Sequence, residues 1–536
     1  ALSGYPFDRG GGIFIDNIYT ITKNLNFLNC NAMFGGAISL KDSDANLFNI
    51  NIEGNNSLNY GGGILIDSSN PIIENCSIFN NHAQTYGGGL YCINNSNPII
   101  KKTYIFNNEA ESGGGLSSFN SSSPNIENCH IYDNSAIRGA GISLFYDSEP
   151  IIDSTEIYNN IASSFGGGIY NAYANPIIKN SKIHSNTSLN GGGIALLTSN
   201  FVQFTNTKIE YNTAVGFGGG IYIDNNNQNL SNLIISNNNA EIGGGIYINN
   251  STTDLTNISI QYNQADYGGG VFTSNVDGYF DDLIIYQNYS LNGGGIFLNN
   301  YSKIYFFNSL FHYNNANSFG GAIALEQDSN LELKYCTINN NNASFYGGGI
   351  YAWENSKINI INNTIANNES QFGSAITSIS QSSTNIINSI IWNNFNDNYF
   401  TDDNSIKAYY SNIQYALDGE KNIRINPNFQ KIFFDSFLIG NESKCIDKGT
   451  KIFILNNDTL FYHKSYNGRS PDIGSNEYIG SIGDINNDDN FDIIDILLLI
   501  NIISNQSSYK IVCDLNNDGY LDILDVISLF NWIINS

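Results

Sequence analysis

Two twelve-residue segments near the C-terminus carry oxygen-bearing side chains at fixed positions. They read DINNDDNFDIID (484–495) and DLNNDGYLDILD (514–525), and each has Asp or Asn at positions 1, 3, 5, 9 and 12. Calcium binds six to eight oxygens, which such a loop supplies from these side chains and from the backbone carbonyl at position 7. The predicted side-chain ligands are Asp484, Asn486, Asp488, Asp492, Asp495, Asp514, Asn516, Asp518, Asp522 and Asp525. With Asn490 and Tyr520 as carbonyl donors, the loops predict two bound Ca2+ ions.

The turn inside each loop and the segment after it fit the same interpretation. Gly519 stands at the sharp turn of the second loop, where a positive φ is needed. Asp489 takes that place in the first loop and can adopt a positive φ at some energetic cost. An apolar segment follows each loop, and we expect one helix in each of these segments.

Two loops about thirty residues apart, each followed by one predicted helix, resemble a dockerin module over residues 483–536. The resemblance implies docking onto a cohesin module, with positions 10 and 11 of each loop helping to choose the partner. Cellulosomal dockerins often carry small hydroxyl residues there, whereas this chain has Ile493, Ile494, Ile523 and Leu524. The resemblance therefore implies an apolar partner surface, either a cohesin-like module or the protein's own cap.

A glycine-rich repeat organises most of the remaining chain. Its first glycine recurs every 25 to 27 residues, at Gly10, Gly35, Gly61, Gly87, Gly113, Gly139, Gly166, Gly191, Gly218, Gly243, Gly268, Gly293, Gly320, Gly347 and Gly373. A fixed period of this size indicates a solenoid. Alternating apolar residues, as in Ile221-Tyr222-Ile223, favour strands over helices. We expect a parallel β-helix of about 15 or more coils, each with three short strands, and right-handed as parallel connections are.

Two further columns of the repeat predict what fills the coils. Asn recurs once per coil, at positions 55, 81, 108, 134, 160, 186, 212, 238, 263, 288, 314, 341 and 368. Stacked Asn side chains can form a ladder of amide hydrogen bonds that satisfies a buried turn. Three residues earlier, an apolar side chain recurs, usually Ile, and we expect it to point inward.

The repeat resembles one family, and the segment after it resembles another. FHYN (311–314) followed by GGAI (320–323) is similar to the repeat of chlamydial polymorphic outer-membrane proteins, which are surface-exposed β-helix adhesins. The run SIIWNN, YYSNIQ, INPNF, KCIDKGT and SPDIGSNEY resembles the C-terminal end of secreted bacterial β-helix proteins of the choice-of-anchor Q type. We therefore expect β-helix repeats at 1–390, last coils and a cap at 391–479, and the dockerin at 480–536.

Composition excludes several classes of partner. The net charge is −26, with 48 acidic and 22 basic residues, which argues against nucleic acid and against an anionic membrane surface. The most apolar run, 493–503, is too short to span a bilayer.

The seven cysteines have no disulfide-framework spacing and fit buried small hydrophobes. The chain begins directly in a repeat, so we interpret its start as processed or as the start of a fragment.

The sequence shows no clear catalytic set. A polysaccharide lyase needs a base beside acids that hold calcium, and a glycoside hydrolase needs paired carboxylates. The densest acid patch that has an arginine nearby surrounds Arg138. Its acids are Glu127, Asp133, Asp147, Glu149 and Asp153. We favour a structural interpretation, because one column of successive coils reads Glu74, Lys101, Glu127, Asp153 and Lys179, an outward ladder of mostly alternating charge.

An aromatic column is the candidate binding surface of the rod. Its members, which we expect to point outward, are Phe14, Tyr91, Tyr170, Tyr222, Tyr247, Phe272, Phe297 and Tyr351. Tyr222, Tyr247, Phe272 and Phe297 lie on consecutive coils. Ring stacking that stiffens the sheet is the favoured interpretation, and a platform for sugar rings or for a protein is the alternative.

Three functional hypotheses follow. The first is a secreted cell-surface or matrix rod for non-catalytic adhesion, scaffolding or glycan binding, anchored through the calcium-dependent dockerin. The second is a polysaccharide lyase or glycoside hydrolase. The third is a subunit of a self-assembling, head-to-tail extracellular fibre, because the N-terminal coil presents a bare strand edge.

Overall fold

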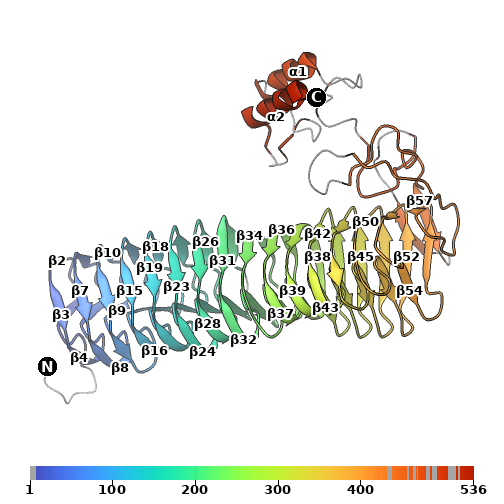
Figure 1. The fold of residues 1–536 in the computed structure, drawn as a ribbon. Helices are drawn as coiled ribbons and strands as arrows, with labels where there is room; N and C mark the ends of the chain where they lie inside the picture. The colour runs from blue at the N-terminus through green and yellow to red at the C-terminus, as the bar shows by residue number, and fades with distance from the viewer. Residues whose placement is uncertain are drawn as a thin grey trace.

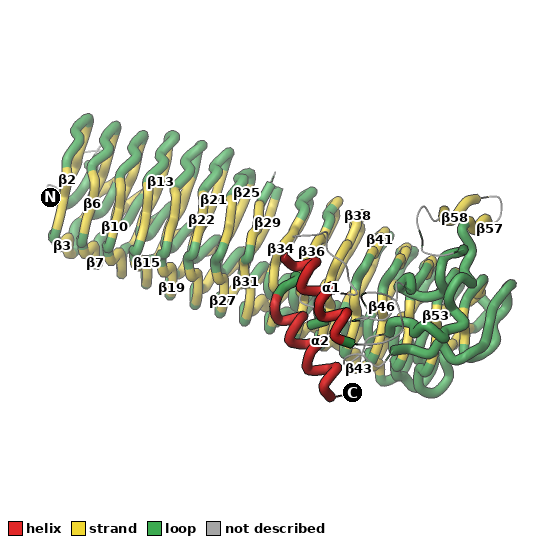
Figure 2. The backbone as a smooth tube through the Cα atoms, turned by 90° about the horizontal axis from the view of Figure 1, so that it is seen from above, coloured by secondary structure: helices red, strands yellow, loops and turns green. Residues whose placement is uncertain are grey.

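The computed structural model describes residues 8–198, 201–430, 437–455, 458–462, 466, 469–478, 483, 485, 492–504, 513, 515–516 and 520–535. Parallel coils stack into one rod, from β1 (Ile13–Asp16) to β56 (Asn412–Ile413), coloured blue to orange in Figure 1. Seen from above in Figure 2, the strands of successive coils lie side by side along the whole rod. The expected parallel β-helix is confirmed.

A coil in the N-terminal half has four strands. One such coil consists of β23 (Glu156–Tyr158), β24 (Ile161–Phe165), β25 (Ile169–Ala172) and β26 (Ile177–Lys179). The expectation of three strands per coil was wrong here, because a left-handed residue such as Asn180 (φ 49°) separates β26 from β27 (Lys182–His184). In the C-terminal half the positions of β26 and β27 join into one strand, and β38 (Val271–Tyr286) includes both of these positions. It belongs to a 36-stranded sheet.

Stacked aliphatic side chains fill the centre of the rod. The expected inward column is in register from coil to coil, with Ile157 opposite Ile131 and Ile183. All three are fully buried. Because each coil contributes the same few side chains, the core is one continuous apolar column rather than a globular centre.

The glycine motif makes one corner of each coil. The first glycine has φ between +56° and +68° in all fifteen copies, the left-handed region that glycine adopts without the steric cost of a Cβ atom. A Cβ atom at Gly88, the second glycine of its motif, would lie 2.5 Å from the backbone oxygens of Glu109 and Gly114. The motif therefore allows neighbouring coils to approach until their backbones touch.

The predicted amide ladder is present and fully buried. Asn186 donates to the Oδ1 atom of Asn212 from both its backbone N–H and its Nδ2, each at 3.0 Å. Asn212 then donates its Nδ2 to Asn238 at 3.0 Å and to the Ile183 carbonyl at 2.9 Å. The ladder runs from Asn55 to Asn394, one coil further than the sequence pattern predicts. Each side-chain amide thus satisfies the backbone hydrogen-bonding groups of a turn that water does not reach.

The chain after the repeats packs onto the outer face of the last coils. The strands β54 (Tyr399–Thr401) and β55 (Ile406–Tyr409) continue the parallel pairing. Cys445 and Ile473 then cover Ile390, and Ser475 donates its Oγ hydrogen to Thr364 Oγ1 at 3.1 Å. Strands β57 (Ile452–Leu455) and β58 (Asp458–Tyr462) form an antiparallel hairpin that also packs on the last coils. The domain boundaries at 390 and 479 stay predictions.

The two expected helices follow the two acidic loops. They are α1 (Ile493–Ser504) and α2 (Ile523–Asn535), and they share a small core of Ile496, Leu499, Cys513, Leu515 and Leu529. Among the described residues, neither helix is long enough to cross a membrane. All seven cysteines are free thiols, and six of them are buried.

Replacing one ladder asparagine should destabilise the rod strongly. Asn212→Ala leaves the Asn186 backbone N–H, one Asn186 Nδ2 hydrogen and the Ile183 carbonyl without their partners in a buried turn. We expect a loss of about 3 kcal/mol or more in the free energy of unfolding, measured by denaturant titration. The control is Asn51→Ala, which removes one exposed hydrogen bond to Asn26. Equal stability of the two variants would show that the ladder contributes little.

Candidate functional site

One buried aspartate closes each acidic loop. The Oδ1 atom of Asp495 accepts a hydrogen bond from the Ile485 N–H at 2.7 Å, and its Oδ2 accepts one from the Asp492 N–H at 3.0 Å. Asp525 repeats the arrangement with the Leu515 and Asp522 N–H groups, at 2.8 and 2.9 Å. Both aspartates are fully buried. The side chain at position 12 therefore ties the start of its loop to the start of its helix.

The aspartate at position 9 caps each helix. Asp492 accepts the Ile494 N–H at 2.7 Å, and Asp522 accepts the Leu524 N–H at the same distance. Such a carboxylate satisfies an N–H that has no partner within the helix. The two loops therefore have the same backbone course where both are described.

The donor chemistry of the loops fits calcium. Asp492, Asp495, Asn516, Tyr520, Asp522 and Asp525 all offer oxygen donors, and Asp484, Asn486, Asp488, Asn490, Asp514 and Asp518 lie outside the described residues. Within the described ranges, no three His, Cys, Asp or Glu side chains converge as a metal site. The sequence from 483 to 536 has nine aspartates and a single basic residue, Lys510. A buried carboxylate needs a compensating charge, and a divalent cation would supply it.

Apolar side chains cover one exposed face of each helix. The predicted partner-facing residues Ile493, Ile494, Ile523 and Leu524 are all exposed. Further along the helices, Leu497 and Ile500 on α1 correspond to Ile527 and Phe530 on α2. These eight side chains are 41% to 65% exposed, and we call them the helix-pair face. Large apolar side chains exposed in this number indicate a surface that binds a partner.

The aromatic column stacks as expected but is not an open platform. Tyr222 and Tyr247 stack with centroids 5.3 Å apart, and Phe272 and Phe297 continue the stack. Tyr222, Phe272 and Phe297 are 8%, 6% and 1% exposed, so the expectation of outward exposure was wrong for them. The cause is a second row of rings, including Phe165 and Phe217, that packs over the column. The column therefore forms a secondary core.

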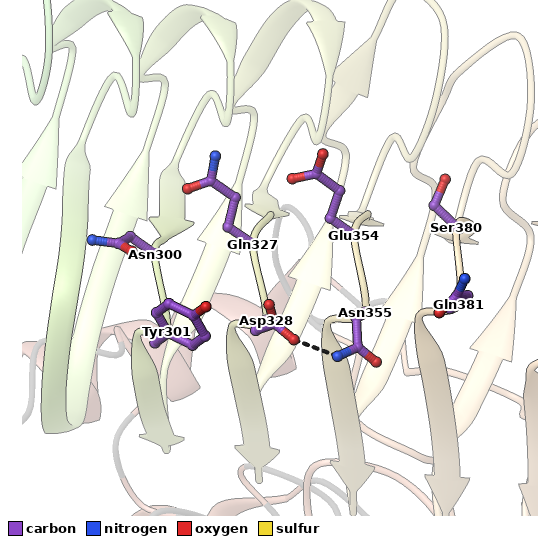
Figure 3. Close-up of a pocket in the computed structure, with 8 residues that line it drawn as sticks. All are labelled: Asn300, Tyr301, Gln327, Asp328, Glu354, Asn355, Ser380 and Gln381. Atoms are coloured by element: carbon purple, nitrogen blue, oxygen red, sulfur yellow. Dashed lines mark hydrogen bonds between the residues drawn. The ribbon is translucent and has the colours of Figure 1, made fainter.

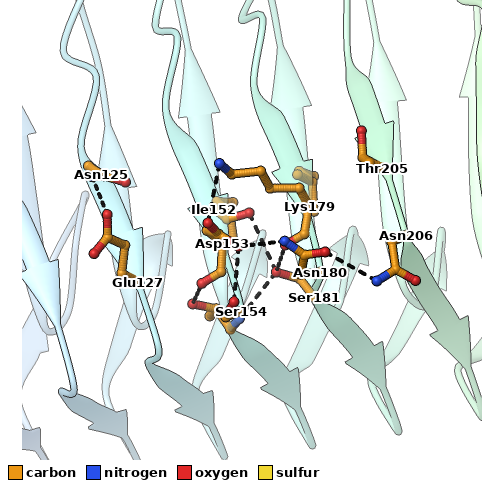
Figure 4. Close-up of polar contacts among 12 residues, drawn as sticks. Asn125, Glu127, Ile152, Asp153, Ser154, Lys179, Asn180, Ser181, Thr205 and Asn206 are labelled. Atoms are coloured by element: carbon orange, nitrogen blue, oxygen red, sulfur yellow. Dashed lines mark hydrogen bonds and ion pairs between the residues drawn. The ribbon is translucent and has the colours of Figure 1, made fainter.

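The acid patch near Arg138 divides between different sheets. Glu127 and Asp153 belong to β18 (Asn125–Glu127) and β22 (Ile151–Asp153), whereas Arg138 belongs to β20 (Ser135–Arg138) on another face. Figure 4 shows three members of the predicted charge ladder, Glu127, Asp153 and Lys179, of which Lys179 pairs with Asp153 at 3.2 Å. The hydrogen bond from Asn180 is the main cause of a lowered pKa at Asp153. These contacts support the structural interpretation of the column.

A polar groove of about 490 Å³ follows one row of turns, and sequence reasoning did not single it out. Four successive coils each place two left-handed residues there. The pairs are Asn300 and Tyr301, Gln327 and Asp328, Glu354 and Asn355, and Ser380 and Gln381. In Figure 3 the side-chain amide of Asn355 donates a hydrogen bond to the carboxylate of Asp328 on the neighbouring coil. The only sequence signal is a serine that follows each pair, at 302, 329, 356 and 382.

One acid beside this groove should make stability depend on pH. Burial raises the pKa of Glu326 to about 7, with a smaller contribution from the Glu354 carboxylate. A carboxyl whose pKa is higher in the folded than in the unfolded state stabilises the fold at low pH, and this contribution is lost as the pH rises through about 7. Because Glu326 is partly exposed, we expect Glu326→Gln to gain only ~1 kcal/mol at pH 8, and nothing at pH 4. Denaturant titration at both pH values measures this, with the exposed Glu149→Gln as control. Equal gains at both pH values would contradict the assignment.

Comparisons with known proteins agree with this architecture. A family described as "Right handed beta helix region" matches residues 11–160, 136–253 and 244–458, and the "Dockerin type I domain" family matches residues 482–533. Among solved structures, the crystal structure of pectate lyase Pel9A is similar at 12% identity, over 78% of this chain and 88% of that one. Its TM-score of 0.27 is too low to support any argument about this chain. A comparison with curated proteins found no match.

The resemblances to polymorphic outer-membrane repeats and to a choice-of-anchor cap stay predictions. The chain belongs to the right-handed β-helix family and carries a dockerin type I domain at residues 482–533.

Proposed function

We propose that this protein is an extracellular rod that binds or scaffolds without catalysis, and that its dockerin attaches it to a cohesin-like module when calcium is bound. A dockerin indicates extracellular assembly through a cohesin–dockerin complex. The observation that carries the proposal is the helix-pair face, with eight large apolar side chains at equivalent places of α1 and α2. Burying such a face against a partner would supply most of the binding free energy.

The non-catalytic assignment of the rod rests on the acids near Arg138. Glu127 and Asp153 take part in a structural ladder, and Arg138 pairs with Glu111 at 3.8 Å on a different sheet. A lyase or hydrolase would need a base and acids on one groove. Turnover of pectin, alginate or xylan by the purified protein would replace this assignment with an enzymatic one.

Removing calcium should unfold the helix pair and leave the rod folded. The aspartates of each loop repel one another without a cation, and the helices share their core only when the loops are closed. We expect a chelator to abolish the helical circular dichroism signal without changing the thermal transition of the rod. Asp495→Ala together with Asp525→Ala should have the same effect, and Asp16→Ala on the rod should have none. A helical signal that persists in chelator would refute the calcium assignment.

Polar substitutions on the helix-pair face should abolish cohesin binding without unfolding the module. Ile493, Ile494, Ile523 and Leu524 are 48% to 65% exposed, so changing all four to Ser removes little of the core. Against a panel of cohesin modules in calcium, we expect the unmodified chain to bind at least one module and the variant to bind it about 100-fold more weakly. The control is Ile161→Ser, an exposed apolar position on the rod. Unchanged affinity of the four-residue variant would exclude this face as the contact.

A further inference from the structure

One outer face of the rod combines exposed apolar side chains with a nearly complete lack of positive charge. Its strands form an eight-stranded sheet from β4 (Asn31–Phe34) to β32 (Thr213–Phe217) and a four-stranded sheet from β37 (Gln264–Tyr267) to β47 (Asn342–Ala343). In Figure 1, β24 and β32 lie along the lower side of the rod, and we call this surface the lower face. Arg138 is the only lysine or arginine in these strands, and it pairs with Glu111 at 3.8 Å.

The two sheets of the lower face meet at one coil that has little regular pairing. Between β32 and β37 the pairing is reduced to isolated bridges at Asn239 and Ile242. A hollow of about 400 Å³ lies there, and its lining comes from three successive coils. The lining residues are Thr213, Ala214, Val215, Asn239, Ala240, Glu241, Gln264, Ala265 and Asp266. The three alanines are buried, so the outward side chains on either side of them form the walls of what we call the acidic hollow.

Two carboxylates give the acidic hollow its charge. Glu241 and Asp266 are exposed, and each follows by two residues a member of the bridged pair Asn239 and Gln264. Neither carboxylate forms an ion pair with another described residue. Lys208 is nearby in the chain, but it belongs to β31 (Thr207–Glu210) of a different sheet. Two like charges at the coil spacing of about 4.8 Å repel one another, and a cation placed between them would remove that repulsion.

Exposed apolar side chains flank the acidic hollow in both directions along the rod. On the N-terminal side, Ile161, Leu189 and Val215 are 44% to 66% exposed. On the C-terminal side, Tyr289 and Leu291 of β39 (Tyr289–Asn292) are 37% and 41% exposed. Large apolar side chains gathered on one face indicate a surface that binds a partner. The partner must therefore present apolar groups on both sides of a positive group.

We propose that the lower face binds a helix of a partner protein, which inserts one arginine into the acidic hollow and lays apolar side chains on either side of it. The guanidinium group pairs with Glu241 and Asp266 and donates to the side-chain oxygens of Asn239 and Gln264. Strand register places Ile161 and Leu291 five coils apart. That separation is ~24 Å, which a helix of about sixteen residues spans. An arginine surrounded by apolar contacts is a common centre of a protein interface.

The charges of the lower face favour this partner over two other occupants. A second copy of the rod would bring the carboxylates of both chains together, with Arg138 as the one arginine that each face contributes. A neutral sugar would leave Glu241 and Asp266 without a counter-charge. The proposal rests on the proposed function only in treating the rod as a binding surface.

The test measures binding of helical peptides to the full chain in calcium by fluorescence anisotropy. Each labelled peptide has about sixteen residues with leucines along one face, and the central residue of that face is Arg, Gln or Glu. We expect the arginine peptide to bind about tenfold more tightly than the glutamine peptide, and the glutamate peptide to bind most weakly. The preference for arginine should shrink as salt is raised. Equal binding of the arginine and glutamine peptides would overturn the proposal.

Matched charge variants separate the acidic hollow from general attraction to an acidic protein. Glu241→Gln with Asp266→Asn should abolish the preference for arginine and leave binding of the glutamine peptide unchanged. Glu109→Gln with Glu111→Gln makes the same change of charge at exposed positions of the same face and should leave the preference intact. An equal loss of preference in both pairs would contradict insertion of arginine into this hollow.

Apolar variants test the rest of the contact. Leu189→Ser with Leu291→Ser should weaken all the peptides about tenfold, whereas Leu58→Ser with Phe345→Ser, at exposed positions outside the span of the helix, should not. The four-residue variant of the helix-pair face should bind the arginine peptide as the unmodified chain does. If that variant alone lost the peptide, the contact would lie on the dockerin and this proposal would fail. Cohesin binding is measured separately, so either proposal can fail while the other stands.

Discussion

Every coil of the rod must satisfy its backbone polar groups with the coils on either side. The strands do this through parallel pairing, but each coil also buries turns that have no strand partner, and hydroxyl groups satisfy some of them, as where the Ser96 N–H donates to Ser122 Oγ at 3.1 Å. The asparagine ladder solves that problem at one turn of each coil, because one amide can accept from the coil before it and donate to the coil after it. The coil spacing, the glycine corner and the continuous aliphatic column all depend on this turn being satisfied.

That constraint divides the surface of the molecule into structural and adaptable parts. Inward positions and corners repeat in nearly every coil, so recognition must come from outward rows, from the turns and from the segments after the repeats. The groove of Figure 3 lies on one row of turns, and a hollow of about 370 Å³ joins outward strand rows to Leu460 of the segment after the repeats. The dockerin adds a separate helix-pair core that depends on its acidic loops rather than on the rod.

The sequence predicted those features in which one residue type recurs at one position. The amide ladder, the inward isoleucines and the positive φ of the first glycine follow from period alone, and the helices after the acidic loops follow from ligand spacing. The aromatic column was predicted to be exposed because alternation places it outward. Alternation cannot show that rings from the neighbouring sheet, such as Phe165, cover it. The hollow beside Leu460 was not predicted, because it joins Leu460 to strands that begin at Lys303, far apart in the chain and outside any period.

Hydrogen–deuterium exchange on the full chain tests the role of the ladder most directly. If the ladder holds the coils together, backbone amides of the ladder asparagines, for example Asn160, Asn186 and Asn212, will be among the slowest to exchange. They will also lose protection together, in one cooperative opening of the rod. Exchange at these positions as fast as at exposed turn residues such as Asn206 would contradict the account.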